Sequence, residues 1–372
     1  MLMDSLTRFK SLMNRQSDGL DRILIDYWAS SDVDQRICKY YKVKEKEHLL
    51  DLLDVDFRYI DGPSYIGPTL SQHPDNSEDD IWGVPRKKVY YGEGEHQGYY
   101  KTVVQYPLAD AKTVDDIDAY EHWPDPDWLD YAVIRDQCDL VHEKQRVVMF
   151  MGDRLNRIAQ LKPMMYLRGI EKALSDLGRK ESPIFDAILD KIVNFYKEYL
   201  ERILRAANGK IDVIVTGDDF GQQNGLICNP NTWREKLLPG FRDYIQIAKK
   251  YKVYVMHHTC GSVTPIIPDM IEAGLDILNP IQPFTYNMDH TMLKDKWGDK
   301  LIFHGGVSLQ GPLRFGNSME VEQEVRTRCE ILGRNGGYII CSAHNLNTDM
   351  KTENIVALFN AYQKYCPYPA FK

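Results

Sequence analysis

The sequence predicts a (β/α)8 TIM barrel that forms a single domain over residues 1–372, with an elaborated N-terminal or rim segment. Two observations lead to this prediction. Eight short apolar runs follow one another along the chain, and helical patterns lie between the later ones. Strand and helix in alternation imply parallel strands with crossover helices. Eight such strands suggest a closed barrel, and barrels often use a chain of this length as one domain.

The predicted strands are short apolar runs, as expected for parallel strands that are buried on both faces. In chain order they are residues 23–29, 57–60, 146–152, 212–219, 253–260, 277–282, 301–306 and 338–344.

Predicted helices fill the intervals between the later strands. Residues 182–208 carry apolar side chains at three- and four-residue spacing and end at Asn208-Gly209, a typical helix stop. Three further segments repeat this pattern, at residues 232–251, 263–274 and 319–337.

Residues 61–145 do not fit the alternation of strand and helix, because the segment is far too long for a simple connection. It is rich in Tyr, Trp, Pro and Asp, as in "DDIWGVPRKKVYYGEGEHQGYY". We therefore expect it to form a lid or rim beside the barrel mouth.

Composition excludes several classes of function. The formal net charge of −8 argues against nucleic acid or an anionic membrane as the main partner. The N-terminus has scattered charges and no signal-peptide core, and no apolar run approaches the roughly 20 residues that cross a bilayer. Seven widely spaced cysteines do not resemble a disulfide framework. We expect a cytoplasmic protein.

Polar residues concentrate at the carboxyl ends of the later strands, where barrel enzymes carry their chemistry. These residues are Asp218, Asp219, His257, His258, Cys260, Gln282, His304, Cys341 and His344. Four of the ten histidines of the chain belong to this set, which indicates a site at the barrel mouth.

The His-x-Cys pair of the fifth strand has the spacing of a metal site. Side chains alternate along a strand, so His258 and Cys260 face the same way. Zinc takes both donor types, and Cys341, on the last strand, is the candidate third ligand. The alternative is that these are buried cysteines that bind nothing, as most are. No CxxC occurs, so a three-ligand site with an open position is favoured over a closed structural site.

The other polar residues have a functional and a structural interpretation. Asp218 and Asp219 are candidate catalytic residues that orient His258, bind substrate or supply a proton, or else form a turn in which one caps a helix. Gln282, His304 and His344 are candidate substrate-binding residues. Each of the two histidines could instead serve the structure or replace a zinc ligand.

Three segments resemble the uroporphyrinogen decarboxylase superfamily: "HHTCGSVTPIIPDMIEAGLDILNPIQP", "LIFHGGVSLQGPL" and "GGYIICSAHNLNTDMKTENIVALFNAY". More narrowly, they are similar to its zinc-dependent, corrinoid-linked methyltransferase branch. That resemblance implies a (β/α)8 barrel whose zinc is held by a His-x-Cys pair and a later Cys. The matching positions are His258, Cys260 and Cys341.

Two departures refine this resemblance. The porphyrinogen decarboxylases carry an Arg-Gln-Ala-Gly-Arg-Tyr motif after the first strand, and "ILIDYWASSDVDQRI" lacks it. Arg154 follows the third strand, but a single arginine there is too little to predict a site that binds a substrate carboxylate. The Asp-x-His-x-x-Gly motif of corrinoid-carrying domains is also absent, since Asp289 and His290 are adjacent. A corrinoid would therefore arrive on a separate corrinoid protein or free in solution.

The leading hypothesis is a zinc-dependent methyltransferase that moves a methyl group between a small substrate and a corrinoid, either methylcobalamin or cob(I)alamin. The substrate is a methyl ether, an alcohol or a thiol, and the aromatic 61–145 segment slightly favours O-demethylation of an aryl methyl ether. A homodimer is compatible with this hypothesis. The alternatives are a metal-free tetrapyrrole decarboxylase and a non-catalytic corrinoid- or tetrapyrrole-binding protein, because fold does not prove function.

Overall fold

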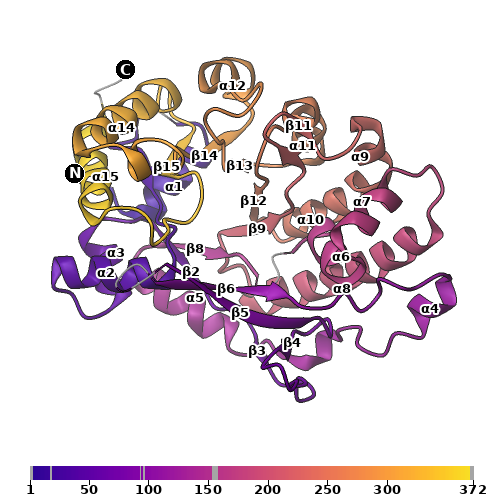
Figure 1. Cartoon of the computed structure of the whole chain (residues 1–372). Helices are drawn as coiled ribbons and strands as arrows, with labels where there is room; N and C mark the ends of the chain where they lie inside the picture. The colour runs from indigo at the N-terminus through magenta and orange to yellow at the C-terminus, as the bar shows by residue number, and fades with distance from the viewer. Residues whose placement is uncertain (1–2, 17–18, 93, 95–96, 153–157, 369–372) are drawn as a thin grey trace.

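Eight parallel strands form a barrel that is surrounded by helices (Figure 1). The computed structural model describes residues 3–16, 19–92, 94, 97–152 and 158–368. Paired strands follow the order β1-β15-β14-β13-β12-β9-β8-β2. Where β2 returns to β1, the backbone N–H of Asp56 donates to the carbonyl of Ile25 at 2.9 Å. The predicted TIM-barrel fold is confirmed.

Every predicted strand is present, and none extends more than one residue beyond its predicted range. The barrel strands are β1 Leu24–Ile25, β2 Phe57–Tyr59, β8 Val147–Phe150, β9 Val213–Gly217, β12 Tyr254–His258, β13 Ile277–Asn279, β14 Ile302–Val307 and β15 Tyr338–Ser342.

The predicted helices are present, with two divisions, one of which separates the predicted helix 263–274 into a 3-10 helix, Thr264–Ile266, and α11. α8 stops at Asn208, which is left-handed at φ 49°. The predicted helix 232–251 divides into α9 and α10, because Pro239 has no backbone N–H to donate to the carbonyl of Glu235. Among the described residues, no helix is both long enough and apolar enough to cross a membrane. The helices are α1 Ser5–Met13, α2 Ser31–Tyr41, α3 Lys46–Leu52, α4 Val114–Asp118, α5 Ile134–Glu143, α6 Leu161–Arg168, α7 Ile170–Leu177, α8 Pro183–Ala207, α9 Pro230–Lys236, α10 Leu238–Lys250, α11 Ile267–Ala273, α12 His290–Trp297, α13 Pro312–Phe315, α14 Ser318–Leu332 and α15 Thr352–Tyr365.

Alternation along the strands separates an inner core from an outer one. On β12, Met256 packs inside the barrel, whereas Val255 belongs to the core between the barrel and its helices. His257 also faces outward, where its ring lies 4.9 Å from that of Phe241 on α10. His258 therefore faces inward, on the same side as Met256.

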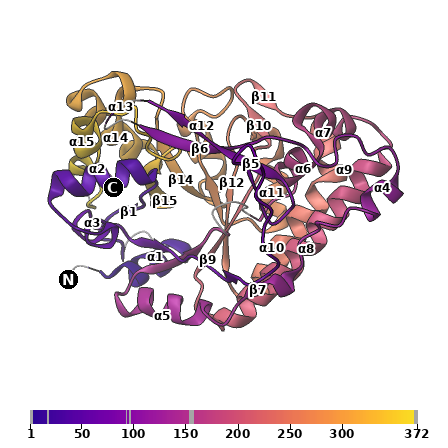
Figure 2. The same ribbon diagram turned by 60° about the horizontal axis from the view of Figure 1, so that its bottom comes forward.

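The amino-terminal end of the barrel is closed by α1. Phe9 and Leu12 of this helix join the inner core. The ring of Phe9 makes edge contacts with Phe57 at 5.9 Å and Tyr254 at 5.7 Å. Figure 2 shows α1 at the opposite end of the strands from the hairpin β5–β6.

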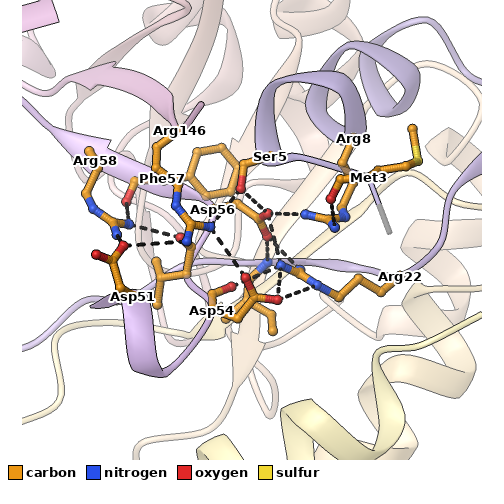
Figure 3. A network of polar contacts seen from close by, with 12 residues as sticks. Met3, Ser5, Arg8, Arg22, Asp51, Asp54, Asp56, Phe57, Arg58 and Arg146 are labelled. Atoms are coloured by element: carbon orange, nitrogen blue, oxygen red, sulfur yellow. Dashed lines mark hydrogen bonds and ion pairs between the residues drawn. The ribbon is translucent and has the colours of Figure 1, made fainter. Parts of the chain in front are cut away.

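A buried ion cluster ties α1 to the seam between β1 and β2 (Figure 3). Asp56 is fully buried and accepts hydrogen bonds from Ser5 Oγ at 2.8 Å and from Arg8 Nη1 at 2.6 Å. It also accepts from Arg22 Nη1 at 2.7 Å and from the backbone N–H of Ile25 at 2.8 Å. One carboxylate therefore holds three consecutive parts of the chain together.

The 61–145 segment forms two small sheets and then returns to the barrel. Its long hairpin, β5 with β6, has one end at α6, where the Arg86 guanidinium lies 4.3 Å from the Tyr166 ring. Toward its other end, burial and the carboxylates of Asp32 and Asp349 raise the pKa of Tyr91. The hairpin thus reaches from α6 toward the residues after β15. α5 belongs to the outer layer, because it packs on β8 and α8. The remaining elements are β3 Ser64–Tyr65, β4 Glu78–Asp79, β5 Pro85–Tyr91, β6 Gly98–Val103, β7 Leu129–Asp130 and the 3-10 helix Pro126–Trp128.

The buried side chain of His290 should make the free energy of unfolding depend on pH. His290 Nε2 lies 3.0 Å from the carbonyl of Ile281 and its Nδ1 lies 3.2 Å from Arg328 Nη1, so the neutral ring satisfies both contacts. Burial and Arg328 lower the pKa of His290 to about 4. Below its ordinary pKa of 6.5 the unfolded chain binds a proton that the folded chain refuses. Stability is therefore lost as pH falls from 6.5 toward 4, by up to about 3 kcal/mol.

His290→Gln removes this proton uptake. We expect urea denaturation at several pH values to show a smaller loss of unfolding free energy between pH 6.5 and 4 in the variant. Equal losses in the variant and the unchanged protein would contradict this assignment.

Candidate metal centre at the barrel mouth

Three donors meet where β12 and β15 end. His258, Cys260 and His344 each offer a ligand atom, and these atoms all lie within 4.8 Å of one another. The Cys260 Sγ to His258 Nε2 distance is 3.6 Å. The rings of His258 and His344 have centroids 5.8 Å apart. The structure thus brings together the predicted His-x-Cys pair and a histidine that we predicted as substrate-binding.

Backbone geometry presents Cys260 to this group. Gly261, the next residue, has φ +83°, a backbone conformation that residues with a side chain rarely adopt. A Cβ at Gly261 would stand 2.3 Å from the carbonyl carbon of Gly221, in the hairpin formed by β10 Gly221–Gln222 and β11 Gly225–Leu226. The Gly261 N–H donates to Gln282 Oε1 at 2.9 Å. Gln282, predicted to bind substrate, thus fixes the loop that carries Cys260.

Asp219 lies beside the donor group and carries a partner that sequence reasoning missed. Its Oδ1 accepts the backbone N–H of Cys260 at 3.0 Å and lies 3.7 Å from His258 Nε2. Its Oδ2 pairs with Lys162 Nζ at 3.1 Å. Burial tends to raise the pKa of Asp219, but the Lys162 ammonium and the backbone N–H of Cys260 outweigh it and hold this pKa well below its ordinary value. The carboxylate is therefore charged.

Asp218 caps α6 and is not a member of the donor group. Its two oxygens accept three backbone N–H groups, from Gln160, Leu161 and Lys162, at 2.6, 3.1 and 2.7 Å. Burial raises the pKa of Asp218 to about 6, against the lowering effect of these donors. The helix-capping interpretation of one aspartate thus applies to Asp218, although α6 precedes it in the chain.

Cys341 belongs to a second, deeper group. Its sulfur lies within 4.8 Å of ligand atoms of Asp26 and His304, and all three residues are about 1 % exposed. Burial and the charge of Asp26 raise the pKa of the Cys341 thiol well above its ordinary value. Cys341 is therefore not a member of the group formed by His258, Cys260 and His344, whose donor atoms all lie within 4.8 Å of one another. His304 is likewise buried and does not line either of the two cavities beside the donor groups.

Trp28 lies between the two groups. Its ring centroid is 5.6 Å from that of His258 and 5.6 Å from that of His304. Its indole N–H donates to Tyr59 Oη at 2.6 Å, and Tyr59 donates to Asp26 Oδ2 at 2.6 Å. Trp28, just after β1, and Tyr59 of β2 thus supply aromatic side chains beside the candidate centre.

Two cavities open beside the donor groups. One, of about 220 Å³, is lined by His344, Gln282, Gln223 and Gln310, among others. The other, of about 400 Å³, is lined by Tyr27, Trp28, Tyr59 and Met151, among others. The first is therefore rich in amides and next to His344, whereas the second has an aromatic wall above the barrel interior.

Sequence reasoning missed Asp26, Tyr59 and Asn279, although a signal for them existed. Each lies two residues after an inward-facing apolar residue, namely Leu24, Phe57 and Ile277. The period of two along a strand places them at the inner face. Lys162 gave no such signal, because it is in the first turn of α6. Arg154 lies outside the described residues.

Comparison with known proteins gives a family and a fold. The uroporphyrinogen decarboxylase (URO-D) family model matches residues 102–365. No curated protein matches the chain. Among solved structures, a methyltransferase from Methanosarcina mazei is 15% identical and has a TM-score of 0.62, with 98% of this chain and 99% of that chain covered.

More distant barrels also match. A GH113 β-1,4-mannanase is 13% identical, covers 93% of this chain and 99% of its own, and has a TM-score of 0.42. Xylanase 10B from Thermotoga maritima is 10% identical, covers 64% and 82%, and has a TM-score of 0.40. At such identities the structural likeness shows the fold alone.

Proposed function

This chain belongs to the uroporphyrinogen decarboxylase family, and from that premise we propose that it is a zinc-dependent methyltransferase. It moves a methyl group between a small substrate and a corrinoid that a separate protein carries or that arrives free. The observation that carries the proposal is the close approach of His258 Nε2 and Cys260 Sγ, 3.6 Å apart, at the barrel mouth. The methyltransferase from Methanosarcina mazei, which shares the fold over 98% of this chain, is compatible with it.

The donor pair fits zinc. Nitrogen and sulfur atoms bound to one tetrahedral zinc lie about 3.5 Å apart, given Zn–N and Zn–S bonds of about 2.0 and 2.3 Å. His258 Nε2 and Cys260 Sγ are 3.6 Å apart. His258 Nδ1 lies 2.6 Å from Asn279 Oδ1, the outer contact that metal-binding histidines commonly make. Both residues can therefore close on one ion with little movement.

We propose Cys341 as the third ligand and His344 as a substrate-binding residue. The family resemblance supports Cys341, and its side chain faces the barrel interior on β15. His344 is the geometric competitor, since its ring nitrogen already lies within 4.8 Å of both other donors. Its place on the wall of the amide-rich cavity supports a role in binding substrate. Metal analysis of the two variants separates these assignments.

When bound, zinc would supply a Lewis acid with an open position, which activates a thiol or polarises the oxygen of an ether or alcohol. Asp219 is the proposed catalytic carboxylate. Because its pKa is held low, it remains charged and orients the Lys162 ammonium and the Cys260 backbone. Lys162 carries the proton that a departing alkoxide or phenoxide would need. Asp218 acts through the position of α6 and not by contact.

An aryl methyl ether is the favoured substrate of the ether class. The supporting observation is the aromatic wall of Tyr27, Trp28 and Tyr59 on the 400 Å³ cavity, with Trp28 in ring contact with His258. Three tyrosines of the β5–β6 hairpin lend no support, because Tyr90, Tyr99 and Tyr100 are exposed.

Tetrapyrrole decarboxylation, the activity of the family's name, is disfavoured by the charges at the mouth. A substrate with many carboxylates needs several free cations. Among the described residues that line the two cavities, the Lys and Arg side chains are Arg314 and Lys46. Arg314 is paired with Asp349, and Lys46 with Asp34 at 2.8 Å.

The test is a spectroscopic assay of the zinc-loaded protein with cob(I)alamin and a panel of methyl ethers. We expect an aryl methyl ether to convert cob(I)alamin to methylcobalamin, and Lys162→Met to slow that conversion by about 100-fold or more. Thiol methylation from methylcobalamin without ether demethylation would favour the thiol substrate. Release of carbon dioxide from a tetrapyrrole, with no methyl transfer, would overturn the proposal.

A further inference from the structure

We propose that the carboxylate of Asp26 fixes the tautomer of His258 from three hydrogen bonds away. His304 and Asn279 are the two links between them. The inference rests on the proposed function in that His258 is taken as a metal ligand. It assigns positioning roles to three residues that do not themselves contact the substrate cavities.

The links form a continuous buried path. Asp26 Oδ2 lies 2.9 Å from His304 Nε2, and His304 Nδ1 lies 2.6 Å from Asn279 Nδ2. The other end of the same amide, Asn279 Oδ1, lies 2.6 Å from His258 Nδ1. All four residues are at most 1 % exposed. Water therefore offers no replacement partners along this path.

The direction of every hydrogen bond is set at the Asp26 end. An indole N–H can only donate, so Tyr59 Oη accepts from Trp28 and must send its own hydrogen to Asp26 Oδ2. The backbone N–H of Tyr27 donates to Asp26 Oδ1 at 2.7 Å. Burial and Asp26 raise the pKa of Tyr59 well above its ordinary value, so the phenol keeps its hydrogen. Asp26 thus accepts at both oxygens.

The remaining hydrogens follow in sequence. A carboxylate only accepts, so His304 presents Nε2–H to Asp26, and the neutral ring then has a lone pair at Nδ1. Asn279 must turn its NH2 toward that lone pair and its carbonyl oxygen toward His258. His258 therefore carries its hydrogen on Nδ1.

The consequence lies at the candidate metal centre. With its hydrogen on Nδ1, neutral His258 has a lone pair at Nε2, the atom 3.6 Å from Cys260 Sγ. The opposite tautomer would aim an N–H at the ion. Fixing the tautomer in advance spares the site a rearrangement when the ion binds, and contacts of this kind typically change metal affinity 10–100-fold.

The test reverses the chain of hydrogen bonds from its far end. In Asp26→Asn, the fixed backbone N–H of Tyr27 keeps the amide oxygen at the Oδ1 position, so the NH2 group replaces Oδ2 and the Tyr59 hydroxyl hydrogen turns away from it. The NH2 group then donates to His304 Nε2, which sends the His304 hydrogen to Nδ1 and turns the amide of Asn279 over. His258 then receives a hydrogen bond at Nδ1 and carries its own hydrogen on Nε2. Nitrogen NMR of the metal-free, histidine-labelled protein at alkaline pH distinguishes the two tautomers, and His258→Gln assigns the signal.

We expect the unchanged protein to show a pyridine-type Nε2 at His258, and Asp26→Asn to show a pyrrole-type Nε2. Tyr59→Phe is the matched control, because it removes another buried partner of Asp26 but leaves the carboxylate. It should keep the original tautomer. Zinc affinity should fall about 10–100-fold in Asp26→Asn and less in Tyr59→Phe.

A pyrrole-type Nε2 in the unchanged protein, or the same His258 tautomer in all variants, would overturn the inference. Because the NMR measurement uses metal-free protein, it stands or falls separately from methyl transfer. An active methyltransferase with an unfixed His258 tautomer would refute this inference and leave the proposed function intact. A fixed His258 tautomer in a protein that transfers no methyl group would support this inference and refute the proposed function.

Discussion

Replacing Cys260 with serine should release zinc and abolish methyl transfer. A serine hydroxyl is not among the donors that zinc takes in proteins, which are Cys sulfur, His nitrogen and carboxylate oxygen. The substitution removes one of the two donors that are already 3.6 Å apart. Replacing a residue that hydrogen-bonds to a metal ligand typically lowers metal affinity 10–100-fold. Loss of the ligand itself should therefore lower zinc affinity by about 100-fold or more. Elemental analysis after dialysis against a chelator measures the effect.

Cys228→Ser is the matched control. Cys228 is a half-buried thiol that lies in neither of the two groups of candidate ligands. We expect that variant to keep one zinc per chain and full methyl transfer. A Cys260→Ser protein that retains one zinc per chain would rule out the proposed centre.

The same measurement identifies the third ligand. Cys341→Ser should lose zinc, whereas His344→Gln should keep zinc and raise the KM for the methyl substrate with a smaller change in kcat. The opposite pattern would transfer the ligand role to His344, which stands within 4.8 Å of both other donors.

Replacing Asp56 with asparagine should destabilise the fold by about 3–5 kcal/mol, because it leaves two buried guanidinium groups without their shared counterion. Arg8 and Arg22 both pair with Asp56, at 2.6 and 2.7 Å, and the Asp56 side chain has no exposed surface. These bonds join α1, the start of β1 and the start of β2 (Figure 3). Their loss loosens the seam where the barrel closes.

Asp54→Asn provides the control for that effect. Asp54 also pairs with Arg22, at 2.8 Å, but its side chain is 50 % exposed. Exposed pairs are worth about 1 kcal/mol or less, so the midpoint of urea denaturation should move little. For Asp56→Asn the midpoint should fall with an unchanged slope. Equal shifts in the two variants would show that burial of the ion cluster is not the source of its stability.

The fold could be predicted because its signals are local. Each strand is a short apolar run in the sequence, and helices end at typical stop residues such as Asn208 and Gly274. The division of the predicted helix 232–251 at Pro239 is also a local effect, and it could have been predicted from the sequence because proline has no backbone N–H. The 61–145 segment has a distinctive composition but no apolar period. Its β3–β7 sheet also depends on pairing between distant residues, such as Ser64 with Asp130.

The sequence by itself determined the barrel and the His258–Cys260 pair, since residues two apart on a strand share a face in any fold that keeps the strand. Only the tertiary structure decided that Asp219 and not Asp218 borders the donors. It alone placed His344 beside them and Cys341 with Asp26 and His304. The reason is physical: contacts between different strands depend on register and stagger around a closed barrel, which no local pattern specifies.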